Sequence, residues 1–333
     1  MVRLAFFLVS FWILLFSFRV MQIEGIDPTY KEEGVQLFQP LRTSLSQTID
    51  NIMPYPQSAL LSGIILGNQS SLPQYFRQQL QITSTIHIVV VSGQNLTILA
   101  GFVMSLVGLI GRRKTIILTL FVIVFYSLIT GFGVPVVRAA IMAGLTYTGK
   151  LMGKEGTGWW ILFLTGGLML LYQPNWLLNI SFQLSFLATF GVVVVAPVFS
   201  KALEKIPKLI REDFAVTLAA QLMVLPVIAY NFNQISVAGL IANSLVLWSI
   251  PLVMISGFVA MVFGFFNIML GTVIGLIPGI LLTYFIYIVQ FFSKIPGASF
   301  NINQTGVITW VGYYLILAVT IYHLSKQKQA NMV

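Results

Sequence analysis

The sequence predicts an all-α, polytopic integral membrane protein with about ten transmembrane helices, and three observations carry this prediction. Hydrophobic residues make up 57% of the 333-residue chain, and the mean hydropathy is +0.91. Charged residues make up only 8%, whereas soluble domains carry roughly a quarter, so these side chains are too few for a water-exposed surface. The apolar residues also form runs of about 20, the length at which a helix spans a bilayer.

The predicted spans follow one another with short connections. They cover 4–23, 86–110, 115–132, 135–152, 158–172, 177–199, 214–230, 237–265, 268–292 and 306–324. The first span is expected to be a retained signal anchor, because its apolar run is longer than that of an ordinary signal peptide. The long connection 24–85 is polar except for a short piece, 59–66, which we expect to be an interfacial or re-entrant helix. The kinked stretch 237–265 is also compatible with two half-helices.

Basic residues are distributed asymmetrically between alternate loops. A cytoplasmic amino terminus places twelve Lys and Arg residues in the cytoplasm and four outside, as the positive-inside rule requires. The cytoplasmic set is Arg3, Arg112, Arg113, Lys114, Lys150, Lys154, Lys201, Lys205, Lys208, Arg211, Lys326 and Lys328, and the outer set is Lys31, Arg42, Arg77 and Lys294. Both termini are therefore expected in the cytoplasm, with the chain in the cytoplasmic (inner) cell membrane. Topology and anionic lipid then explain most of the net charge of +9, without a nucleic-acid-binding face.

Polar residues inside a span indicate function, because they are expensive at membrane depth. The second span begins near His87 and is interrupted by the run Ser92-Gly93-Gln94-Asn95. A glycine followed by two amides lowers helix propensity and supplies hydrogen-bonding groups, which suits an unwound turn that lines a cavity. The alternative is close helix packing through the two small residues of the run.

Arg138 is the second candidate, one helical turn into the span 135–152. Its side chain either extends outward to the membrane surface or faces the protein interior. No Asp or Glu occurs in any predicted span, so an inward guanidinium has no membrane carboxylate to pair with. Such a group is suited to bind a phosphate.

Amide side chains complete the candidate set. Asn179 and Gln183 are four residues apart and share a helix face, while Gln221 and Asn243 lie in later spans. Hydrogen bonding between helices is the alternative to substrate contact for each of them. In the predicted topology the set falls in the outer half of the membrane, with Gln221 nearer the middle, and suggests a polar cavity open to the outside. The predicted path residues are His87, Ser92, Gly93, Gln94, Asn95, Arg138, Asn179, Gln183 and Asn243.

Over about Ala59 to Val253, these motifs resemble the membrane channel region of ComEC-type competence proteins. That family carries transforming DNA across the cytoplasmic membrane as a single strand. The matching motifs occur in the family's order: Ala59-Leu60-Leu61-Ser62-Gly63-Ile64-Ile65-Leu66-Gly67, His87 with Ser92-Gly93, Pro135 with Arg138-Ala139 and Met142, and Pro174 with Phe182-Gln183-Leu184-Ser185-Phe186. The resemblance implies a signal anchor and short extracytoplasmic segment over 1–58, a competence-type channel domain over 59–325 and a short basic tail over 326–333.

The chain departs from the family pattern in two ways. Asn95 stands where the family usually has a histidine, so no role that needs a second imidazole is carried over. The resemblance also implies that full-length family members carry two further domains, one of the oligonucleotide-binding type and one that is metallo-β-lactamase-like. The segment 24–58 is too short for the former, and no histidine-aspartate metal motif occurs, so we expect neither domain, no metal and no nuclease activity in this chain.

The leading functional hypothesis is a transmembrane channel for inward passage of single-stranded DNA in competence and transformation. No phosphate-binding loop of the Gly-x-x-x-x-Gly-Lys type occurs, so a cytoplasmic helicase-type motor is an expected partner, with a DNA receptor, a nuclease and membrane lipids. The alternative is a secondary transporter or permease for a small anionic solute. An intramembrane enzyme has little support, because the predicted spans contain no carboxylate and only two histidines, in the second and the last span, from which no catalytic group can be assembled. We expect no cofactor.

Overall fold

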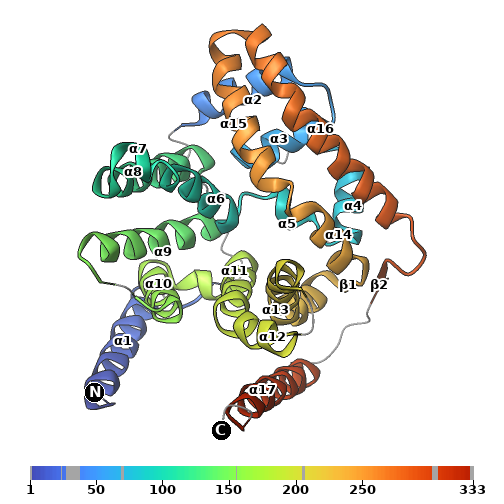
Figure 1. Ribbon diagram of the computed structural model, residues 1–333. Coiled ribbons are helices and arrows are strands. Elements are labelled where there is room, and N and C mark those ends of the chain that lie inside the picture. The colour runs from blue at the N-terminus through green and yellow to red at the C-terminus, as the bar shows by residue number, and fades with distance from the viewer. Residues whose placement is uncertain are drawn as a thin grey trace.

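The computed structural model describes residues 2–23, 25–27, 38–68, 71–154, 156–204, 207–301 and 307–330, which form an almost entirely helical chain (Figure 1). Lys31 and Lys205, which support the predicted topology, lie outside the described residues. The first helices are α1 (Val2–Gln22), α2 (Gln39–Ile52), α3 (Gln57–Leu66), α4 (Gln74–Ile82), α5 (Ile86–Val89), α6 (Gly93–Met104), α7 (Val107–Ile110), α8 (Arg112–Thr130), α9 (Val134–Leu151) and α10 (Gly158–Tyr172).

The second half contains the remaining helices and two short strands. In order they are the 3-10 helix η1 (Pro174–Leu178), α11 (Ile180–Phe190), the π-helix η2 (Gly191–Val195), α12 (Ala196–Ala202), α13 (Lys208–Phe232), β1 (Gln234–Ser236), α14 (Ala238–Leu247), α15 (Ile250–Phe266), α16 (Ile268–Ser293), β2 (Ser299–Asn301) and α17 (Val307–Ala330). Each predicted span lies mainly in helices of the described chain. The predicted tail continues α17 as far as Ala330.

The lengths of these helices support some of the predicted spans. In the described part of the chain, four helical stretches are long and apolar enough to cross a membrane: Arg112–Thr130, Ile180–Ala202, Phe214–Phe232 and Ile268–Ser293. A fifth span results if α14 and α15, which are bent by 48° at their junction, count as one. The structure therefore confirms an all-α chain with apolar helices of spanning length, while the count of ten spans stays a prediction.

Breaks divide two of the predicted spans. The stretch 237–265 forms two helices on either side of Trp248 and Ser249, as its kinked pattern indicated. The stretch 86–110 is divided further, into α5, α6 and α7, and its longest piece has only 12 residues. The interruption near Gly93 thus separates true helices and does not merely bend one.

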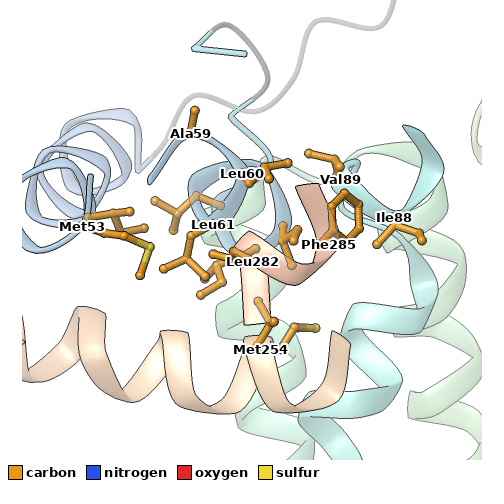
Figure 2. Packing of buried hydrophobic residues seen from close by; sticks show 14 of the residues in the cluster. Met53, Ala59, Leu60, Leu61, Ile88, Val89, Met254, Leu282 and Phe285 are labelled. Atoms are coloured by element: carbon orange, nitrogen blue, oxygen red, sulfur yellow. The ribbon is translucent and has the colours of Figure 1, made fainter. Parts of the chain in front are cut away.

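The main core is built from α2, α3, α15 and α16, with contributions from α4 and α5 (Figure 2). Helix α3 is buried on every side, because each residue of Ser58–Leu66 is buried. Helix α2 contributes Leu45, Ile49 and Ile52 to the same core, although its sequence is polar on average. The segment 38–58 therefore packs against α3, α15 and α16. The complete burial of 59–66 does not fit an interfacial position, while the re-entrant alternative stays a prediction.

A tight turn joins α15 to α16. The side chain of Asn267 accepts hydrogen bonds from the backbone N–H groups of Met269 (2.9 Å) and Leu270 (3.2 Å), so it caps α16. Gly264 and Gly271 allow the two backbones to approach, since a Cβ on either glycine would contact the other helix or Ile52 of α2. Beyond the far end of α16, β2 pairs antiparallel with β1, with Ile235 opposite Phe300.

Side chains of α1 bind the backbone of α10. The indole of Trp12 donates to the carbonyl oxygen of Gly167 at 3.2 Å. Arg19 donates through Nε to Leu171 and through a terminal nitrogen to Tyr172, each at 3.0 Å. The carbonyls of Leu171 and Tyr172 belong to the last turn of α10, where a helix lacks donors of its own. The first helix is therefore anchored to the rest of the fold by side-chain-to-backbone bonds.

Candidate functional site

The interruption between α5 and α6 lies against the buried helix α3. A Cβ on Gly63 would lie 2.7 Å from Cγ1 of Val89, and a Cβ on Gly67 would lie 2.9 Å from Cγ2 of Val91. Gly63 lies in the last turn of α3 and Gly67 is the residue that ends this helix, and the lack of a side chain at both positions lets the connecting chain approach closely. The packing of Val89 and Val91 against these two glycines explains why the chain is extended here.

Asn95 connects the start of α6 to the end of α3. Its side chain is 2% exposed and donates through Nδ2 to the carbonyl oxygen of Ile64 at 2.8 Å. Its Oδ1 accepts a hydrogen bond from the hydroxyl of Ser92 at 3.3 Å. The amide predicted to line a cavity is thus occupied by contacts within the protein, and it fixes the position of the broken helix.

Arg138 lies beside the same interruption. Its side chain is only 8% exposed. Its guanidinium packs against Gly93, because a Cβ added to this glycine would overlap a terminal nitrogen of Arg138. One terminal nitrogen donates to the carbonyl oxygen of Ser185 on α11 at 2.8 Å, while Nε is buried without a partner among the described residues. Arg138 therefore faces the protein interior, which is one of the two orientations that the sequence left open.

The electrostatics of this region are unbalanced. In the described part of the chain no carboxylate pairs with Arg138, whose only hydrogen bond is to a neutral carbonyl. A buried charge without a partner costs on the order of several kcal/mol. The guanidinium also lies at the amino-terminal end of α6, where the helix dipole is positive and the residue before the helix, Ser92, makes no capping bond. Two sources of positive potential therefore coincide.

Of the remaining predicted residues, Gln94 is adjacent to this centre in the chain, and the others have surroundings of their own. Gln94 and His87 are exposed, and Nδ1 of His87 lies 2.8 Å from the carbonyl oxygen of Ser84 in its own turn. Asn179 caps α11 by accepting from the backbone N–H groups of Ser181 and Phe182. Within the described residues, no hydrogen bond connects any of these side chains to Arg138 or Asn95.

The later amides also have local surroundings of their own. Gln183 donates to the carbonyl oxygen of Leu177 at 3.0 Å, which binds α11 to the preceding η1. Asn243 on α14 is 6% exposed, and its Oδ1 is buried without a partner among the described residues. Gln221 donates weakly to the carbonyl oxygen of Ser236, at 3.5 Å. The structure thus brings Ser92, Gly93, Asn95 and Arg138 together, with Gln94 next to them in the chain. The other predicted path residues, His87, Asn179, Gln183 and Asn243, lie elsewhere in the fold.

Four residues contribute to this centre through their backbone and not through a polar side chain. The carbonyl oxygens of Ile64 and Ser185 serve as acceptors, and backbone groups carry no sequence signal of their own. The pair Gly63 and Gly67 does have a signal, the small-x-x-x-small spacing that permits close approach. No group of three His, Cys, Asp or Glu side chains that could hold a metal occurs in the ranges that the structure describes.

Comparisons with known proteins connect this arrangement to a family. The family model described as competence protein matches residues 64–327. ComE operon protein 3 of Bacillus subtilis is 26% identical over 208 residues, which cover 62% of this chain and 26% of that protein. Uncharacterized protein YcaI of Escherichia coli is 27% identical over 249 residues, covering 71% of this chain and 31% of that protein. The chain thus spans about a quarter to a third of the length of these relatives. No solved structure matches it.

Proposed function

Because the chain belongs to the family of ComEC-type competence proteins, we propose that it forms a membrane channel for the inward passage of single-stranded DNA. The matched region, 64–327, includes α5 to α16 and so contains the whole centre around Arg138. One observation supports the channel function most directly: a buried guanidinium that pairs with no carboxylate of the described residues lies at a break in a helix. Membrane transporters use such breaks to present backbone dipoles to their substrates.

The predicted spans contain few cations, which fits a path through which DNA passes without being held tightly. Proteins that hold single strands tightly line a groove with many Lys and Arg side chains. Here the predicted spans contain three cations, Arg19, Arg138 and Lys150. Arg19 is committed to the carbonyls of α10, and Lys150 lies at the predicted cytoplasmic end of its span, so Arg138 is the one that remains at membrane depth. A largely neutral path with one cationic contact would bind a passing phosphate weakly enough to release it.

The proposal includes an orientation and a set of partners. Both termini lie in the cytoplasm, and the chain lies in the cytoplasmic membrane, as the distribution of Lys and Arg indicates. The chain itself performs no catalysis. A DNA receptor, a nuclease that leaves one strand and a helicase-type motor are therefore separate proteins or separate domains.

A permease for a small anionic solute is the second candidate function. The same centre favours it, because an Arg beside the amino terminus of a broken helix suits a carboxylate or phosphate of any origin. A small solute would need one such contact, whereas a strand would meet it once for every nucleotide. The two functions therefore differ in substrate and share the site.

Deletion of the gene distinguishes the two functions. We expect a deletion strain to lose uptake of labelled DNA and genetic transformation, and a plasmid copy to restore both. Uptake of phosphate and of small organic acids should be unchanged in the same strain. Normal transformation together with loss of one solute's uptake would exclude the channel and support the permease.

A further inference from the structure

The first turn of α6 and Arg138 form a region of positive potential that the described chain leaves uncompensated. Gly93 is the first residue of α6, and the guanidinium of Arg138 lies directly against it. A cation is normally unfavourable at this end of a helix, where the dipole favours an anion. We infer that these groups form a binding site for one phosphodiester anion.

The donors required for such a site are present. A guanidinium has five N–H donors, of which Arg138 uses one on the carbonyl oxygen of Ser185, while its buried Nε has no partner in the described chain. The first backbone N–H groups of a helix have no intrahelical acceptor, and no side chain caps them in α6. Guanidinium and helix N–H groups are the donors that proteins use most often to hold phosphate.

The absence of a side chain at position 93 keeps these two donor sets together. A Cβ there would overlap the terminal nitrogen of Arg138 and would lie 3.1 Å from the Cβ of Ala139. An alanine would therefore displace the guanidinium from the start of α6. Glycine at this position is consistent with a requirement for close approach between the two donor sets.

The chemistry of the site indicates which part of a nucleic acid it would contact. A planar guanidinium and backbone N–H groups recognise the oxygens of a phosphate and carry no information about the base. The inference rests on the proposed function for the identity of the polymer, a single DNA strand, and it adds that the strand is recognised through its phosphates one at a time. Recognition of this kind predicts no preference for base sequence.

A binding measurement on the full chain tests the site. The protein is reconstituted in phosphatidylcholine nanodiscs and titrated with a fluorescent oligothymidylate and with the same oligomer carrying uncharged methylphosphonate linkages. We expect the phosphodiester oligomer to bind. The methylphosphonate oligomer should bind with an affinity that is lower by about tenfold or more, because charge-assisted hydrogen bonds to the phosphate are lost.

Variants assign the binding to the site. Arg138→Gln should weaken binding of the phosphodiester oligomer about tenfold or more. Gly93→Ala should weaken it with Arg138 still present, and Arg112→Gln, which removes an exposed cation on α8, should leave it unchanged. Thermal unfolding of each reconstituted variant identifies any that is misfolded. If Arg138→Gln does not fold, Gly93→Ala, which keeps every charge, then shows whether the oligomer binds at this site.

Several outcomes would overturn the inference. Equal binding of the two oligomers would indicate recognition of bases, and equal binding by wild type and both site variants would place the phosphate elsewhere. Loss of oligomer binding in nanodiscs containing phosphatidylglycerol, with retention in pure phosphatidylcholine, would show that the site holds a lipid headgroup. Failure of the site leaves the deletion phenotype intact, whereas a deletion strain that transforms normally rejects the channel even if the site binds phosphate.

Discussion

The side-chain amide of Asn95 donates a hydrogen bond of 2.8 Å to the carbonyl oxygen of Ile64. Ile64 lies in the last turn of α3, where the carbonyl groups have no donors within the helix. Asn95 is in the first turn of α6, so one side chain satisfies the end of one helix from the beginning of another. The broken span and the buried helix are thereby held as a unit.

Replacement of Asn95 by leucine should therefore destabilise the protein by about 1–3 kcal/mol, because the buried carbonyl of Ile64 loses the donor that Asn95 supplies. Thermal unfolding in detergent measures this change. Gln94→Leu is the matched control, since Gln94 is adjacent and exposed, and it should shift the unfolding temperature little. Equal unfolding temperatures for the two variants would show that the bond between Asn95 and Ile64 contributes nothing to stability.

Arg19 should stabilise the attachment of α1 to α10. Arg19→Met removes the donors to the carbonyl oxygens of Leu171 and Tyr172, and we expect a loss of about 1–2 kcal/mol in the free energy of unfolding. Limited proteolysis should also cleave the connection after α1 faster in this variant. Arg113→Met, at an exposed position on α8, controls for the loss of a positive charge. The prediction fails if both variants are cleaved at the same rate.

Gly191 should be essential for the contact between η2 and α13. A Cβ at this position would lie 2.7 Å from the carbonyl oxygen of Ala219, and backbone atoms cannot move aside as a flexible side chain can. We expect Gly191→Ala to destabilise the protein by about 1–3 kcal/mol. Gly144→Ala on α9 meets nothing within 4 Å and should be neutral or stabilising by roughly 0.5–1 kcal/mol. A similar effect of both substitutions would mean that the helices are not in close contact here.

The two interrupted spans were visible in the sequence because they depend on local chemistry. A glycine between polar residues lowers helix propensity in the stretch 86–110, and the proline at position 251 limits where a helix can continue in the stretch 237–265. Both stretches are divided in the structure. The inward orientation of Arg138 is compatible with the lack of span carboxylates, but its partner is a backbone carbonyl of a helix 47 residues away. That contact depends on tertiary packing, which local patterns do not specify.

Burial of α2 and α3 shows where averages over a segment mislead. Arg42 and Asp50 make α2 polar on average, although Leu45, Ile49 and Ile52 recur on one face and enter the core. Helix α3 is too short to span a bilayer, and length alone could not tell a surface position from complete burial. The amides of Asn179 and Gln183 likewise have a local explanation, since both satisfy backbone groups of their own segment.

Labelling of single cysteines should establish the orientation of the chain in the membrane. The chain contains no cysteine, so each introduced thiol is unique without further engineering. Lys294→Cys lies between α16 and β2, on the side predicted to be outside, and should react with a membrane-impermeant maleimide in intact cells. Lys154→Cys and Lys201→Cys lie in predicted cytoplasmic loops and should react only after the membrane is permeabilised.

The pairing of β1 with β2 makes this labelling test sharper. It requires the end of α13 and the end of α16 to lie on the same side of the membrane, as the alternating topology demands. A thiol at Lys294 should therefore report the side of both ends. The unsubstituted chain controls for reagent that binds without a thiol. Labelling of Lys154→Cys and Lys201→Cys in intact cells, with protection of Lys294→Cys, would show that the chain is inserted in the opposite orientation.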